Sequence, residues 1–172
     1  MFMKYWVITA ILLVNIIIQS TLFSFLQIMG TQPDTLIMLV TGFSLLDSSG
    51  IGIIAGLAGG LIQDIMYGGP LGLNAVQYMI IAYLIGLLRD KIFVGKVFVP
   101  AVAAFCSTII RGLMMMGYLY FTRSEIPMSY GFTLVILPEA VYTAVLMPVV
   151  FYFLSILFSK RFMKKKWHFR RR

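Results

Sequence analysis

Charged side chains are scarce in this sequence, and their scarcity excludes most classes of soluble protein. Of the 172 residues, 12% are charged and 60% are hydrophobic, whereas an ordinary soluble domain carries about 25% charged residues. A water-soluble domain of this size has too small an interior to bury so much apolar surface. The composition therefore excludes a soluble enzyme, a disordered region and a coiled coil, and it predicts that lipid surrounds most of the chain.

Cysteine and histidine are almost absent, which removes the usual metal-binding and nucleophilic chemistry. The single cysteine, Cys106, lies in an apolar run, so a disulfide framework and a thiolate metal site are excluded. The single histidine, His168, lies in a basic tail. Because no nucleophile, base and orienting group occur together, we expect no catalytic residues, no metal site and no bound cofactor.

What the sequence does contain is a series of long uncharged runs. A helix needs about 20 mostly apolar residues to cross a membrane. The runs predict about six helices, over residues 5–27, 33–46, 49–66, 71–89, 97–121 and 132–159. The second and third are short for a span, so we expect them to include a flanking polar residue, thin the membrane locally or pack deep within the protein. The predicted fold is an all-α integral membrane protein, with a transmembrane domain over residues 1–159 and a basic tail over residues 160–172.

Basic residues gather on one side of this predicted topology. With both termini in the cytoplasm, the inner side carries Lys4, the basic cluster within residues 89–96 and the tail, whereas the outer side carries Arg123. The positive-inside rule therefore predicts cytoplasmic N and C termini. The tail is expected to contact anionic lipid through Lys164, Lys165, Lys166, Arg170, Arg171 and Arg172. It is too short for nucleic-acid binding to be expected.

Two helix faces are candidates for close packing. Gly52, Gly56 and Gly60 recur at every fourth residue of the predicted third helix, and such a smooth face lets another helix approach closely. Asn15 and Gln19 share one face of the predicted first helix, where amides find partners on other helices. Each face either packs inside this protein or docks the helix of a partner.

The topology also gathers polar residues in the outer part of the membrane. They are Asp34, Asp64, Asn74, Arg111 and Glu139. A charge at the bilayer centre costs about 2.5–3.5 kcal/mol, so we expect Arg111 to face the bundle and to pair with Asp64 or Glu139. The alternatives stay open: Arg111 snorkels to the interface, Asp64 is solvated, and Asp34 and Glu139 are simply carboxylates favoured at helix N-termini.

Three short stretches follow a familiar pattern. Pro33 and Asp34 open the predicted second helix, residues 56–64 read GLAGGLIQD, and Leu71 and Gly72 follow. The second stretch fits the pattern G-x-x-x-G-L-x-x-D, which runs from Gly56 to Asp64. Together these motifs resemble the rod shape-determining protein MreD family.

The resemblance implies a non-enzymatic, multi-pass component of the bacterial cytoplasmic (inner) membrane that belongs to the cell-elongation (rod) complex and helps maintain cell shape. It implies contacts with MreC through helices and extracytoplasmic domains. It also implies indirect links to MreB filaments and to two peptidoglycan synthesis enzymes, RodA and a class B penicillin-binding protein. The implied fold is similar to the substrate-binding subunits of energy-coupling-factor transporters. The alternative function is a small-solute (vitamin-type) binding subunit of a membrane transporter, and a homo-oligomer is left open.

Overall fold

The computed structural model describes residues 2–25, 27, 30–47, 49–89, 98–122 and 131–159, and this part of the chain is helical. The helices are α1 (Phe2–Phe25), α2 (Thr35–Leu46), α3 (Ser49–Tyr67), α4 (Leu73–Arg89), α5 (Phe98–Phe121) and α7 (Leu137–Ser159). A π-helical turn, η1 (Phe132–Ile136), leads directly into α7. The six helices lie where the uncharged runs predict them, with ends that differ by a few residues. The all-α fold class is thereby confirmed.

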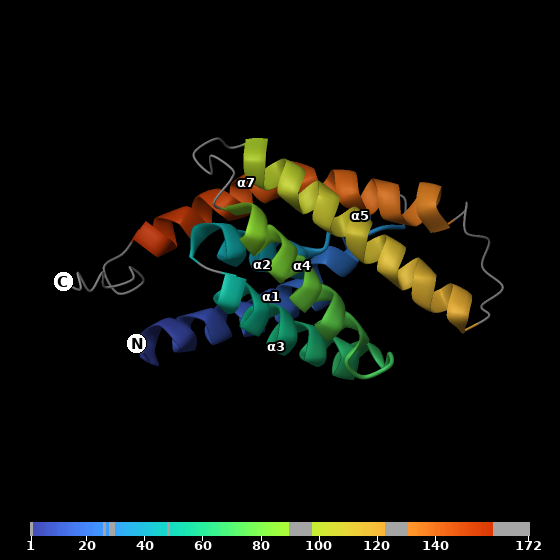
Figure 1. The fold of residues 1–172 in the computed structure, drawn as a ribbon, viewed down its shortest axis with the longest axis horizontal. Helices are drawn as coiled ribbons and strands as arrows, with labels where there is room; N and C mark the ends of the chain where they lie inside the picture. The colour runs from blue at the N-terminus through green and yellow to red at the C-terminus, as the bar shows by residue number, and fades with distance from the viewer. Residues whose placement is uncertain are drawn as a thin grey trace.

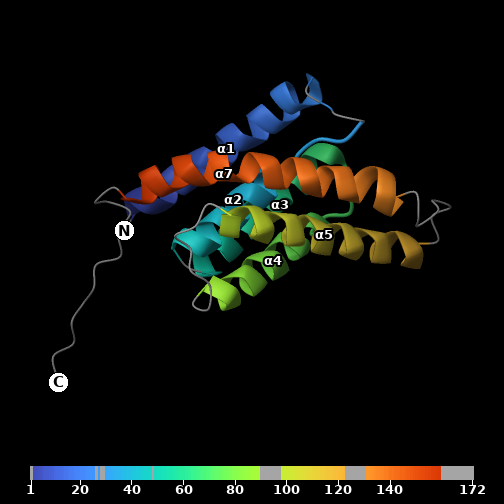
Figure 2. The same ribbon diagram turned by 90° about the horizontal axis from the view of Figure 1, so that it is seen from above.

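Helix α2 lies at the centre of the bundle (Figures 1 and 2). It packs against α1, α3, α4, α5 and α7, and residues 35–45 are all buried. Its 12 residues cover about 18 Å, well short of the roughly 30 Å hydrocarbon core. The expectation that this short helix packs deep within the protein therefore holds, since longer helices surround it.

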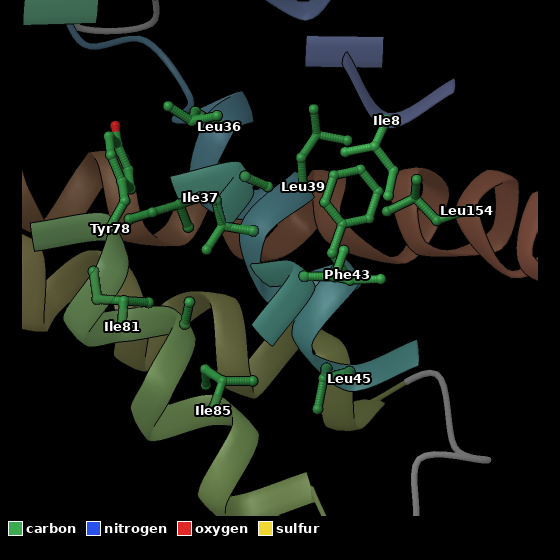
Figure 3. Packing of buried hydrophobic residues seen from close by; sticks show 14 of the residues in the cluster. Ile8, Leu36, Ile37, Leu39, Phe43, Leu45, Tyr78, Ile81, Ile85 and Leu154 are labelled. Atoms are coloured by element: carbon green, nitrogen blue, oxygen red, sulfur yellow. The ribbon is translucent and has the colours of Figure 1, made fainter. Parts of the chain in front are cut away.

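The core is formed by the side chains that surround α2. Phe43 of α2 packs against Phe158 of α7, with ring centroids 5.7 Å apart. Ile8 of α1 and Leu154 of α7 pack near the same ring, whereas Ile81 of α4 lies on the opposite side of α2 (Figure 3). The core therefore joins the first and last helices through the middle of the bundle.

Helix α4 covers the glycine face of α3. A Cβ atom added at Gly60 would lie 2.5 Å from the Cα atom of Ala75, and one at Gly56 would lie 3.0 Å from the backbone of Tyr78. At Gly52 the added atom would meet the Ser44 side chain of α2. Of the two alternatives for this face, the internal contact is the one observed, and the docking alternative is wrong because no room remains there for the helix of a partner.

The outer surface of the bundle is apolar. Three described stretches are long and apolar enough to cross a membrane: Gly50–Tyr67, Phe98–Phe121 and Phe132–Ser159. Large apolar side chains such as Trp6, Ile65 and Val145 are exposed, as a lipid-facing surface requires. Helix α1 begins and α7 ends at the same end of the bundle (Figure 1). The predicted tail contacts of Lys164, Lys165, Lys166, Arg170, Arg171 and Arg172 lie outside the described residues.

Candidate functional site

Asp34 lies at the N-terminus of α2, where the chain enters the centre of the bundle. Its Oδ1 atom accepts a hydrogen bond of 2.9 Å from the backbone N–H of Ile37, which caps the helix. Its own backbone N–H donates to Thr143 Oγ1 of α7 at 3.1 Å. Aspartate is a preferred N-cap, and the helix dipole stabilises its negative charge. The carboxylate is nevertheless buried, so it needs a positive partner.

Arg111 of α5 supplies that partner. Its Nε atom lies 3.0 Å from Asp34 Oδ2, and its Nη2 donates to Glu139 Oε1 of α7 at 2.6 Å. The guanidinium carbon also lies 5.8 Å from the centroid of the Tyr78 ring, within range of a cation–π contact. The arginine thus faces the bundle rather than snorkelling outward, and it bridges two carboxylates. Glu139 is one of the two partners that the sequence suggests, whereas Asp34 was expected in the cluster but not as a partner.

Asp64 has a different role from the one expected. Its Oδ2 accepts a hydrogen bond from the backbone N–H of Gly72 at 2.8 Å, and its Oδ1 accepts one from the N–H of Asn74 at 3.2 Å. The ion pairs of Arg111 are instead with Asp34 and Glu139, so the hypothesis of an Arg111–Asp64 pair is wrong. The physical reason is that the first N–H groups of α4 have no partners within their own helix, and a carboxylate satisfies them well.

The loop that Asp64 binds has a conformation that requires glycine. Gly72 has a φ of 95°, which is costly for a residue with a side chain. Two residues of the sequence motif therefore have a structural explanation: Asp64 holds the α3–α4 turn closed, and Gly72 allows the turn to present its N–H group. Leu71, by contrast, is 75% exposed and takes no part in this contact.

A chain of hydrogen bonds extends from Asp34 to the first helix. The Tyr78 hydroxyl of α4 can donate its one proton either to Asp34 Oδ2, at 2.8 Å, or to Gln63 Oε1 of α3, at 2.9 Å. Gln63 Nε2 donates to Gln19 Oε1 of α1 at 3.2 Å, and Thr35 Oγ1 donates to the same oxygen at 3.1 Å. Together with the ion pairs on α5 and α7, these contacts form one polar network in which all six helices take part.

The bonded position of Gln19 corrects the expectation for the first helix. Because Gln19 is held by α2 and α3, it is not available to dock the helix of a partner. Asn15 lies one turn away, and its Nδ2 atom is buried without a hydrogen-bond partner among the described residues. The proposed Asn15/Gln19 docking face is thus turned at least in part towards the interior.

Reasoning from the sequence missed four residues of this site, which are Gln63, Tyr78, Thr35 and Thr143. Gln63 gave the clearest signal, since a buried amide beside the motif aspartate must find a partner. Tyr78 lies one helical turn after Asn74, on the α4 face that meets α3. Thr35 and Thr143 gave no signal in the sequence, because a threonine hydroxyl can form its hydrogen bond with a backbone carbonyl of its own helix.

An open cavity of about 340 Å³ lies beside this network. Asp34, Asn74, Arg111 and Glu139 line it, together with Gln19, Gln63 and Tyr78. Of the predicted outer cluster, Asp64 alone is not among its lining residues. The structure therefore brings most of the expected cluster to one cavity, whose walls are rich in hydrogen-bonding groups.

Comparison with known proteins identifies the family. The family model described as rod shape-determining protein MreD matches residues 1–157. No curated protein and no solved structure matches the chain, so the similarity to energy-coupling-factor transporter subunits stays a prediction. The family match includes the Asp64 turn and every residue of the polar network. The chain belongs to the rod shape-determining protein MreD family.

Proposed function

We propose that this protein is a non-enzymatic membrane component of the bacterial cell-elongation complex. In this proposal it helps maintain rod shape by linking MreC, cytoplasmic MreB filaments, RodA and a class B penicillin-binding protein. The observation that carries the proposal is the family match over residues 1–157, since the family is one of shape-determining membrane proteins. The carboxylates of the polar network support a structural role, because both Asp34 and Glu139 are engaged by Arg111.

The proposed topology has six spans in the cytoplasmic membrane, with both termini in the cytoplasm. It is supported by the six helices, by the common end at which α1 begins and α7 ends (Figure 1), and by the distribution of basic residues in the sequence. The polar network then lies at the extracytoplasmic end. A network that ties six helices together at this end would give the extracytoplasmic domain of MreC a surface of constant shape.

Depletion of the protein in its host tests this proposal. We expect rods to widen and round up over a few generations, with new wall no longer inserted in an ordered way along the cylinder. Cell outline and incorporation of a fluorescent wall precursor are the measurements, and re-expression of the native protein from a second locus is the control. Unchanged shape and unchanged lateral wall insertion would contradict the proposal.

A second candidate function is a solute-binding subunit of a transporter. The observation that favours it is the open cavity of about 340 Å³ with its polar walls, because ligand sites are usually concave and carry convergent polar groups. The same depletion separates the two candidates. Growth that requires an added vitamin, with cell shape preserved, would support the transporter and not the elongation complex.

A further inference from the structure

The cavity beside Arg111 is large enough for a small organic molecule. Its walls come from the segment 30–34 before α2, from α1, α3, α4 and α5, and from η1 and α7. The volume of about 340 Å³ corresponds to roughly eleven water molecules at about 30 Å³ each. It also falls within the range of about 300–1,000 Å³ that is usual for ligand sites.

Several polar atoms of the lining are left for an occupant. The ion pairs of Arg111 use Nε and Nη2, which leaves Nη1 as a donor. Glu139 uses Oε1, which leaves Oε2 as an acceptor. The Asn74 side-chain amide makes no hydrogen bond within the described part of the chain, although its backbone N–H is held by Asp64. Donors and acceptors are therefore interleaved around the cavity, and hydroxyl groups, which do both, match such a lining.

The charges of the lining do not balance. With both carboxylates ionised, Asp34 and Glu139 carry two negative charges, and the Arg111 guanidinium between them carries one positive charge. Both carboxylates are shielded from solvent, with side chains 2% and 14% exposed, so bulk water neutralises the excess poorly. An anion that approached Arg111 would also meet both carboxylates. A cation beside Glu139 Oε2 would restore neutrality.

The chemistry of the lining favours an organic cation over a metal ion. Within the described residues, no group of three or more His, Cys, Asp or Glu side chains gathers as a metal site requires. The two carboxylates that are present already bind Arg111. An ammonium group needs a single carboxylate oxygen and a few further acceptors, which Glu139 and the amide oxygen of Asn74 supply.

We propose that this cavity binds a small polyhydroxylated amine in its protonated form. Its ammonium group lies against Glu139 Oε2, and its hydroxyl groups bond to Arg111 Nη1 and to the Asn74 side chain. This ligand class follows from the charge and the free donors and acceptors of the cavity. The inference does not depend on the role in cell shape, and either can fail without the other.

Three six-carbon polyols that differ in charge test the proposal. Glucamine carries an amine, sorbitol is neutral and gluconate carries a carboxylate. The full-length protein is placed in nanodiscs of phosphatidylcholine, which has no net charge, and binding is measured by saturation-transfer NMR with competition titrations. We expect saturable binding of glucamine, at least about tenfold weaker binding of sorbitol and no binding of gluconate. Equal binding of all three probes, tighter binding of gluconate, or no binding of glucamine would overturn the proposal.

Matched variants show whether the binding takes place in this cavity. Val135 lines the cavity and is 45% exposed, whereas Val141 is 48% exposed and lies outside the lining. Val135→Trp should abolish glucamine binding, and Val141→Trp should leave it within about twofold of native. Glu139→Gln keeps an acceptor for Arg111 but removes the charge, so it should lower the glucamine affinity to that of sorbitol. Native-like glucamine binding by both Val135→Trp and Glu139→Gln would place the ligand elsewhere and overturn the proposal.

Discussion

Removal of the Arg111 guanidinium should destabilise the protein more than any other single change in the polar network. Arg111 lies 3.0 Å from Asp34 and 2.6 Å from Glu139, so each pair contributes about 5.5–6.5 kcal/mol of Coulomb attraction at an effective dielectric constant of about 20. Desolvation of the three groups offsets much of this gain. For Arg111→Leu we expect a loss of about 3–5 kcal/mol in the free energy of unfolding, because two buried carboxylates lose their partner.

Removal of the carboxylate charges should reverse most of that loss. In the triple variant Arg111→Leu, Asp34→Asn and Glu139→Gln, no buried charge remains in the former pairs. Asparagine at position 34 still caps α2, since it ranks with aspartate at that position. Replacement of a buried ion pair by neutral groups is often close to neutral in stability. We therefore expect the triple variant to lie within about 1–2 kcal/mol of the native protein.

Denaturant titration in mild detergent, followed by far-UV circular dichroism, measures these differences. The matched control is Arg89→Leu, which removes an arginine whose Nη1 donates to the backbone carbonyl of Asp47 and should cost less, about 1–2 kcal/mol. A triple variant as unstable as Arg111→Leu would refute the argument from uncompensated charge. So would an Arg111→Leu variant no less stable than Arg89→Leu.

Three further substitutions test separate parts of the fold in the same titration. Gly60→Ala should destabilise the protein by about 1–3 kcal/mol, because its Cβ would meet the backbone of α4. The control is Gly117→Ala, which should not destabilise the protein, because its added Cβ meets no heavy atom within 4 Å. Equal effects of the two substitutions would disprove the close α3–α4 contact. Asp64→Ala should cost about 0.5–2 kcal/mol through the lost cap, and Asp64→Asn should cost less because its oxygen still accepts; the reverse order would contradict the capping role. Tyr78→Phe should cost about 1–3 kcal/mol, since Asp34 loses a buried donor, and a change below about 0.5 kcal/mol would show that this hydrogen bond contributes little.

The sequence alone was sufficient to predict the positions of the helices and the inward orientation of Arg111. Uncharged runs bounded by charge, proline or glycine place helix ends closely, because hydrocarbon tolerates few charges. Arg111 has the small or polar residues Ala103 and Ser107 on the same helical stripe, and a stripe of that kind faces protein rather than lipid. The glycine stripe of α3 was likewise visible, although its partner could be either an internal helix or a foreign one.

The sequence suggested Glu139 as a partner of Arg111, but it could not decide between Asp64 and Glu139 and it did not suggest Asp34. Asp34, Asp64 and Glu139 all lie at the same end of the bundle, and pairing among them depends on how each helix is rotated about its axis. Periodicity fixes which residues share a face, not which face meets which helix. Asp64 is bound to its own turn by local backbone N–H groups, and Asp34 remains for Arg111 because the short α2 begins deep inside the bundle.

The most direct test of the account asks whether the network that holds the bundle together also maintains cell shape. The host is depleted of the native protein and supplied with Arg111→Leu or with the triple variant, each adjusted to native abundance in the membrane. The account predicts round cells with Arg111→Leu and rods with the triple variant, because the bundle needs neutralised charge rather than the arginine itself. Normal rods with Arg111→Leu, or round cells with a stably folded triple variant, would contradict it.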